Sequence, residues 1–147
     1  MRTIKGPGVF LAQFASDDAP YNSLAGLAGW AKEKGFIGVQ LPAWDSRIIN
    51  LEKAAESQTY VDEIQGLLAD NGLIVTELAT HLQGQLVALH PAFDLPADSF
   101  APQVVHRNPT ARQEWAVRQL MLAAKASRRF GIDRHVTFSG TLLWPYL

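Results

Sequence analysis

Residues 36–41 read FIGVQL, a short apolar run that follows a segment of helical pattern. An apolar run of this length without strict alternation is typical of a parallel strand that is buried on both faces. The preceding segment, residues 24–31, repeats leucine and alanine at helical spacing, and Asn22 or Ser23 can cap it. Gly35 stands where helices commonly end in a left-handed residue. This stretch therefore predicts a helix followed by a buried strand.

The same alternation extends along the chain. Further apolar runs predict strands at residues 9–14, 73–78 and 136–138. Further helical patterns lie at residues 49–55, 59–71 and 109–130. The last of these begins with Pro109 in its first turn, and a polar and aromatic connection, residues 80–108, precedes it. Its inward face is expected to carry Trp115, Leu120, Met121 and Ala124.

Strands that alternate with helices pair in parallel through right-handed crossovers. Four such units amount to about half of a barrel of ~250 residues, and an apolar tail, residues 142–147, follows the last predicted strand. We therefore expect an α/β fold in which residues 1–147 form a single partial domain. This domain is the N-terminal half of a (β/α)₈ TIM barrel, truncated after four parallel strands with flanking helices. A complete, small four-stranded α/β domain is the competing interpretation.

Composition excludes several classes of function. The net charge is −1 with the two signs mixed, which provides no basic face for nucleic acid. The chain has no cysteine, which excludes disulfides, thiolate zinc sites and cysteine nucleophiles. No apolar run reaches the ~18 residues that suggest a membrane span. The N-terminal segment lacks the pattern of a signal peptide, so we expect a cytoplasmic protein.

The active site of a parallel α/β barrel lies at the carboxyl ends of its strands, so polar residues near those ends are the candidates. His81 comes three positions after the run at residues 73–78, where a barrel aims side chains at a substrate or a divalent metal. Glu77 lies inside the end of that run, where a carboxylate can act as a base. We predict His81 and Glu77 as catalytic residues. The alternatives are a histidine that bonds to loop backbone and a carboxylate that ties loops together.

Five further residues are predicted to contact substrate. Trp44 can pack on the apolar C–H face of a sugar ring, or it can anchor a loop. Asp45 is either a substrate ligand or the N-cap of the following helix. His90 and His81 together are weak evidence for a metal, because their spacing differs from that of a helical zinc motif. The five residues are Trp44, Asp45, Gln83, His90 and Trp144.

Three segments carry a resemblance to a known family: GVQLPAWD (38–45), THLQGQLVALHPAFD (80–94) and FSGTLLWPYL (138–147). Together with the helical segment at 108–131, they resemble bacterial sugar phosphate isomerases/epimerases with a xylose isomerase-like TIM barrel. The resemblance implies a metal-dependent isomerase or epimerase of a sugar or sugar phosphate. Such an enzyme moves a proton next to a carbonyl with the help of Mn²⁺, Mg²⁺, Co²⁺ or Zn²⁺.

The resemblance places the metal ligands mainly beyond the fourth strand. We therefore assign no metal ligand in this chain, and we expect no bound metal and little or no catalysis from the chain alone. The resemblance assigns only the wall of the substrate pocket to this chain, and it places these residues there: Trp44, Asp45, His81, Gln83 and Trp144. A related DNA-repair type of barrel takes a metal-binding histidine from the end of its third strand, which keeps His81 open as a ligand.

Two other functions stay open. A half-barrel can pair its open sheet edges with a second copy in a homodimer, or dock another protein without catalysis. A DNA-repair phosphodiesterase is disfavoured, because the chain lacks a basic face and only His81 lies clearly at a strand end. The expected partner is therefore a small-molecule sugar, with no nucleic acid and no membrane.

Overall fold

The computed structural model describes residues 5–140, which form an α/β fold. Its strands are β1 (Gly8–Phe10), β2 (Gly38–Pro42), β3 (Ile74–Thr80) and β4 (His135–Thr137). Its α-helices are α1 (Leu24–Glu33), α2 (Leu51–Glu56), α3 (Gln58–Asp70), α4 (His81–Gln85), α5 (Asp94–Ala97) and α6 (Pro109–Phe130). Short 3-10 turns occur at η1 (Leu11–Gln13), η2 (Pro91–Phe93), η3 (Asp98–Phe100) and η4 (Gln103–Val105). None of the described helices has the length and apolar character needed to cross a membrane.

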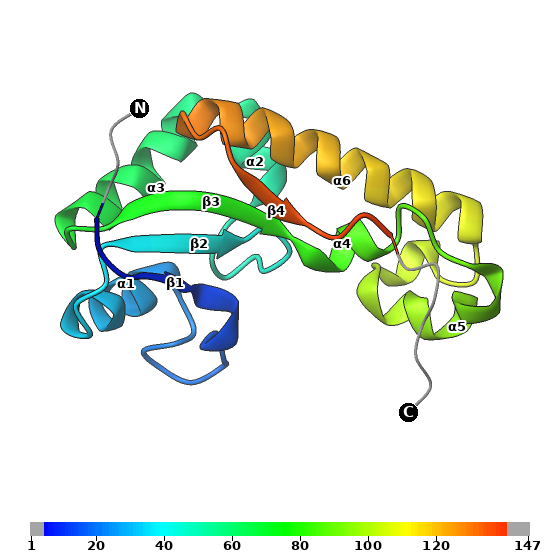
Figure 1. The fold of residues 1–147 in the computed structure, drawn as a ribbon, viewed down its shortest axis with the longest axis horizontal. Helices are drawn as coiled ribbons and strands as arrows, with labels where there is room; N and C mark the ends of the chain where they lie inside the picture. Colours follow the sequence, from blue (N-terminus) through cyan, green and yellow to red (C-terminus); the bar gives the residue numbers. More distant parts are fainter. Residues whose placement is uncertain (1–4, 141–147) are drawn as a thin grey trace.

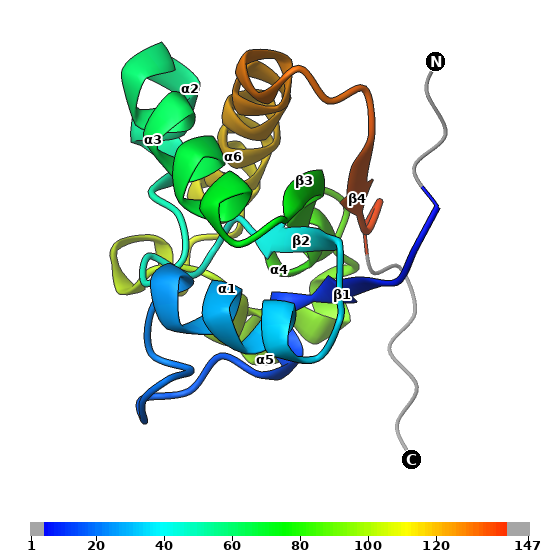
Figure 2. The same cartoon turned by 90° about the vertical axis from the view of Figure 1, so that its left-hand side faces the viewer.

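Within residues 5–140 the strands form one four-stranded sheet in chain order, β1-β2-β3-β4, and every neighbouring pair is parallel. When each new strand is added on the same side of the previous one, right-handed crossovers place all the connecting helices on one face of the sheet. Accordingly, α1, α3 and α6 lie on one side of the strands, which curve around the opposite side (Figure 2). No described helix crosses that opposite side (Figure 1). The predicted parallel α/β architecture is confirmed, and it is compatible with half of a barrel.

The side of the sheet under the helices holds the main core. Val39 and Leu41 of β2 and Leu78 of β3 are fully buried there, which removes their apolar surface from water. The predicted apolar stripes of the first and third helices are confirmed as buried faces. They consist of Leu24, Leu27, Ala28 and Ala31 on α1, and of Val61, Ile64 and Leu68 on α3.

Local signals set the ends of the helices. The Ser23 hydroxyl accepts a hydrogen bond from the Gly26 N–H at 3.2 Å and caps α1. Asn108 caps α6 in the same way by accepting from the Ala111 N–H at 3.1 Å. Gly131 ends α6 with φ of 70°, a left-handed conformation that glycine adopts without steric cost. The predicted cap at Ser23 is confirmed, because it depends only on neighbouring residues.

A bulge in β3 decides which side chains face the uncovered side of the sheet. Val39 pairs with Val75, but the next residue, Gln40, pairs with Glu77, so Thr76 is an extra residue in β3. Strict alternation would send Glu77 to the same side as Val75, into the core. The bulge instead returns Glu77 to the uncovered side, next to Gln40.

The connection between β3 and α6 folds into a small lobe, residues 81–108. Its core consists of Leu86, Ala97 and Ala116. Arg112 of α6 is buried against this lobe and forms ion pairs with Asp94 and Asp98. A buried guanidinium requires such partners, because an unpaired buried charge is strongly destabilising. The ion pairs therefore tie the lobe to α6.

Two predictions from the sequence are wrong in detail. The first strand ends at Phe10, and Leu11 begins η1 instead of continuing the strand to residue 14. On α6, Met121 and Ala124 are exposed rather than inward. The buried face of α6 carries Arg112, Ala116, Gln119, Ala123, Ala126, Ser127 and Phe130. Polar side chains occupy three of these core-facing positions, namely Arg112, Gln119 and Ser127, so the apolar pattern pointed to a neighbouring face of the helix.

Candidate functional site

Four rings meet at the edge of the sheet where the strands end. They belong to Phe10 at the end of β1, Trp44 after β2, His81 after β3 and Phe138 after β4. The centroid of the His81 ring lies 5.3 Å from that of Phe10, 5.8 Å from that of Trp44 and 4.9 Å from that of Phe138. We call these four residues the aromatic cluster. Parallel strands share one carboxyl edge, which is why segments far apart in sequence meet here.

His81 occupies the centre of the aromatic cluster. Its ring stacks on Phe138 with an interplanar angle of 28° and meets Phe10 edge-on at 88°. The His81 side chain is partly exposed and makes no hydrogen bond to another described residue. Neither imidazole nitrogen is therefore held by the described part of the chain. The prediction that His81 lies at the shared strand end agrees with this position, and its catalytic role stays a prediction.

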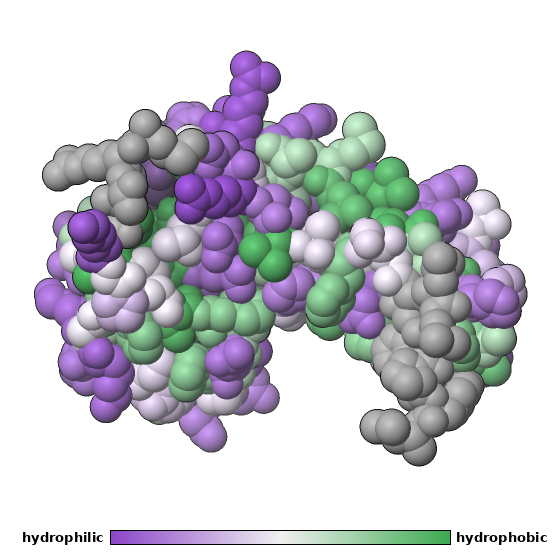
Figure 3. Space-filling model, in the orientation of Figure 1, coloured by the Kyte–Doolittle hydropathy of each residue, from purple (hydrophilic) through white to green (hydrophobic). Residues whose placement is uncertain are grey.

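The molecule is hollowed between the region of α1 and the lobe at residues 81–108, as Figure 3 shows from the uncovered side of the sheet. The surface around this hollow mixes apolar and polar side chains. Phe138 is 49% exposed, which is unusual for a large apolar ring unless another group covers it.

A hydrogen-bonded pair of polar side chains lies in the middle of the uncovered side. Gln40 Nε2 donates a hydrogen bond to Glu77 Oε1 at 3.0 Å, and both side chains are partly buried. The second carboxylate oxygen of Glu77 makes no hydrogen bond to another described residue. The pair therefore fixes the orientation of a carboxylate that keeps one oxygen for a ligand. Its role as a base stays a prediction.

Asp45 is held by a neighbouring arginine. Its two carboxylate oxygens accept hydrogen bonds from Arg47 Nε at 2.9 Å and Arg47 Nη2 at 2.7 Å, and Arg47 also pairs with Asp17 at 2.7 Å. The Arg47 hydrogen bond keeps the pKa of Asp45 below its usual value, although partial burial acts in the opposite direction. Asn50, not Asp45, caps α2, so the alternative reading of Asp45 as a helix cap is wrong.

His135 was not selected from the sequence, yet it lies close to the candidate site. Its Nε2 is 2.7 Å from the Thr80 hydroxyl oxygen, so the side chains of β3 and β4 are joined by a hydrogen bond. Burial, and then the charge of nearby His81, hold the pKa of His135 below its ordinary value. A single histidine at the start of a short strand offers no sequence signal for this arrangement.

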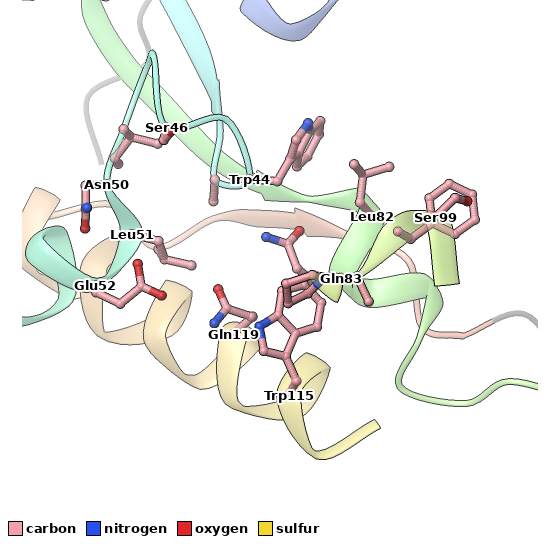
Figure 4. Close-up of a pocket in the computed structure, with 15 residues that line it drawn as sticks. Trp44, Ser46, Asn50, Leu51, Glu52, Leu82, Gln83, Ser99, Trp115 and Gln119 are labelled. Atoms are coloured by element: carbon pink, nitrogen blue, oxygen red, sulfur yellow. The ribbon is translucent and has the colours of Figure 1, made fainter. Parts of the chain in front are cut away.

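Gln83 and His90 are two further predicted residues that lie outside the aromatic cluster. The Gln83 side chain is buried in a pocket that Trp44, Trp115 and Gln119 also line (Figure 4). His90 lies in the lobe, where its Nδ1 accepts a hydrogen bond from the backbone N–H two residues ahead. Trp144 falls outside the described residues.

Within residues 5–140, no group of three histidine, aspartate or glutamate side chains gathers closely enough to hold a metal ion. His81 is surrounded by rings, and the neighbour that Glu77 bonds to is an amide. The described residues therefore do not fit a complete divalent-metal site. A scan against models of protein families and a search of curated proteins find no match to this chain.

Proposed function

We propose that the aromatic cluster forms part of the sugar-binding mouth of a metal-dependent sugar or sugar phosphate isomerase or epimerase with a (β/α)₈ barrel. The observation that carries this proposal is the cluster itself, because it gathers one ring from each strand at the edge where barrel enzymes bind their substrates. The uncovered side of the sheet would be the inner wall of the barrel. Further strands, in the same polypeptide or in another subunit, would close it.

The topology of the sheet supports a barrel over the other common parallel fold. A doubly wound sheet reverses its strand order at one point and carries helices on both faces. The described strands instead run in chain order with the long helices on one side. Extending this arrangement by further βα units would close the curve into a barrel.

The chemistry follows from the positions of the side chains. The indole of Trp44 would pack against the C–H face of a sugar, while His81 would bond to one of its hydroxyl groups. In an isomerisation, Glu77 would accept the proton from the carbon next to the carbonyl and return it to the former carbonyl carbon, while the proton of the adjacent hydroxyl passes to the former carbonyl oxygen. In an epimerisation, the proton would return to the opposite face of the same carbon. Gln40 serves as a positioning residue, because it holds one oxygen of that carboxylate.

A divalent cation, Mn²⁺, Mg²⁺, Co²⁺ or Zn²⁺, would polarise the carbonyl and hydroxyl pair of the sugar when bound. The described residues supply no complete set of ligands for it, so those ligands would come from the remaining part of the barrel. For the 147-residue chain alone we therefore expect sugar binding at most, without isomerisation.

The test is a titration of the labelled protein with D-xylose, D-fructose and their phosphate esters, followed by NMR. We expect saturable shifts of the ring resonances of His81 and Phe10. The variant His81→Ala should lose these shifts, whereas the matched control His90→Ala should keep them. Absence of shifts at the aromatic cluster with every sugar would contradict the proposal.

The expectation about catalysis has its own test. The chain and Mn²⁺ are incubated with the same sugars in D₂O, and deuterium at the carbon next to the carbonyl is measured. We expect none above the rate without protein. Rapid, Glu77-dependent exchange would show that the chain is catalytic alone and that the expected dependence on further strands is wrong.

A second candidate function is self-association of half-barrels into a homodimer. The observation that favours it is that β1 and β4 each pair on one side only within the described part of the chain, and open strand edges invite pairing with another chain. Sedimentation velocity tests it. A dimer at micromolar concentration would support this candidate, and a monomer at all concentrations would count against it.

A further inference from the structure

A pocket lies between α6, α4 and residues 43–52, and it shares Trp44 with the aromatic cluster. Its volume is about 380 Å³, which falls within the range of small-molecule sites. Figure 4 shows the side chains of Gln83 and Gln119 extending into the same space, with the Trp115 indole beside them. Of the described residues that line the pocket, Trp44 also takes part in the proposed function, whereas Gln83 and Gln119 have no role in it.

Gln83 is the residue that points to a ligand. Its side chain is only 1% exposed, and its Oε1 has no hydrogen-bond partner among the described residues. A buried carbonyl oxygen without a partner destabilises a protein, because the oxygen loses its hydrogen bonds to water on folding. A donor group on a ligand in the pocket would restore that hydrogen bond.

The other polar groups of the pocket define what such a ligand would be. Gln119 is 8% exposed, and neither its amide nor the Trp115 indole N–H bonds to another described residue. Carboxamides both donate and accept hydrogen bonds, as hydroxyl groups do, and an indole face suits apolar C–H groups. The described lining contains one carboxylate, that of Glu52, and no lysine or arginine, which disfavours phosphate or carboxylate groups on the ligand.

We propose that this pocket binds an uncharged polyhydroxylated molecule of monosaccharide size, with Gln83 and Gln119 as its hydrogen-bonding residues. The ligand's hydroxyl groups would bond to the two carboxamides, and its C–H face would lie against Trp115. The proposal does not depend on the proposed function, because Gln83 and Gln119 take no part in that function.

One test uses the stability of the protein without ligand. Gln83→Leu replaces the unpartnered amide by an apolar side chain of similar volume, so we expect the Tm to rise by about 3 °C. Gln85→Leu on the same helix is the matched control, since Gln85 lies outside the pocket, and it should leave the Tm unchanged. A fall in Tm for Gln83→Leu alone would show that the amide already has a partner, such as a buried water, and would overturn the proposal.

The second test measures binding by NMR, with myo-inositol and D-glucose as uncharged probes and D-glucose 6-phosphate as the charged one. We expect saturable shifts of the Gln83 and Gln119 side-chain amides and of the Trp115 indole N–H. Gln83→Leu should weaken this binding at least tenfold, about 1.4 kcal/mol, and Gln85→Leu should not. The variant Gln119→Leu provides the same comparison if Gln83→Leu does not fold.

Three results would overturn the proposal: no saturable shift at these residues, equal binding of the phosphorylated probe, or full binding by both glutamine variants. Shifts confined to His81 and Phe10 would place the sugar in the aromatic cluster. That result would support the proposed function while refuting this second site.

Discussion

The two faces of the sheet are built from alternate residues of the same strands, yet they differ in kind. On the covered face, Leu41 and Leu78 are fully buried under the helices. On the uncovered face, Gln40 and Glu77 are partly exposed and bond to each other. Hydrophobic burial accounts for the first face, which would be found in any stable α/β protein. It does not account for an oriented carboxylate and four gathered rings, so the function is to be sought on the second face.

The largest effect should come from removing the bulge that assigns residues to the two faces. Inserting an alanine between Val39 and Gln40 would give Thr76 a partner and restore strict alternation, which turns Glu77 toward the core and Leu78 away from it. We expect the free energy of unfolding to fall by about 4 kcal/mol or more, measured by urea denaturation. The control Thr76→Ala keeps the bulge and loses only the hydrogen bond to the Val39 carbonyl, for a cost of about 1 kcal/mol. Equal stability of the two variants would refute the role given to the bulge.

Truncating one side chain on each face should have a smaller effect on the free energy of unfolding, and the two losses should differ. Leu78→Ala removes a fully buried side chain and should lower the free energy of unfolding by about 3 kcal/mol. Gln40→Ala on the other face should cost about 1 kcal/mol or less, since it loses one partly exposed hydrogen bond. Similar losses in urea denaturation would mean that both faces are structural.

The dependence of stability on pH should reveal the contribution of His135, which lies next to the aromatic cluster. Because the pKa of His135 is lowered by burial and by His81, the folded protein prefers the neutral imidazole. This preference contributes stability above the ordinary pKa of about 6.5, and the contribution is lost as pH falls through the lowered value. We expect the free energy of unfolding of His135→Gln to fall less steeply below pH ~6.5 than that of the unchanged protein. An unchanged decline would exclude His135 as its source.

The smallest effect on stability is expected for Glu77→Gln. The change keeps the volume and one hydrogen bond to Gln40, so the free energy of unfolding should move by less than about 0.5 kcal/mol. In a completed barrel the same variant should abolish proton transfer, because an amide cannot act as a base. Retained activity in an isotope-exchange assay would remove Glu77 from the mechanism.

The fold was largely predictable because its signals are local. Ser23, Asn108 and Gly131 mark helix ends through their own chemistry, and the alternation of strands and helices implies the parallel sheet. The bulge at Thr76 could not be foreseen, since no glycine or proline marks it. The buried face of α6 was missed because Arg112 and Gln119 occupy it, and the burial of the arginine depends on ion pairs with Asp94 and Asp98 of the adjoining lobe.

The candidate site was predictable only in part. His81 and Trp44 could be placed at the strand ends because the edge of a parallel sheet collects such residues. Phe10 and Phe138 were missed, since rings inside or beside apolar runs look like core. Gln83 lies two residues from His81, but its side chain is buried beside Trp115 and Gln119 rather than among the four rings.

The difference in solvent exposure between the two faces of the sheet can be measured by NMR with a soluble gadolinium chelate, which broadens the signals of exposed groups. At dilute, monomeric concentration the account predicts strong broadening of the Gln40 side-chain amide and of the Phe10 and His81 rings. The methyl groups of Leu41 and Leu78 should stay sharp at the same chelate concentration. Equal protection of Gln40 and Leu41 would contradict the account.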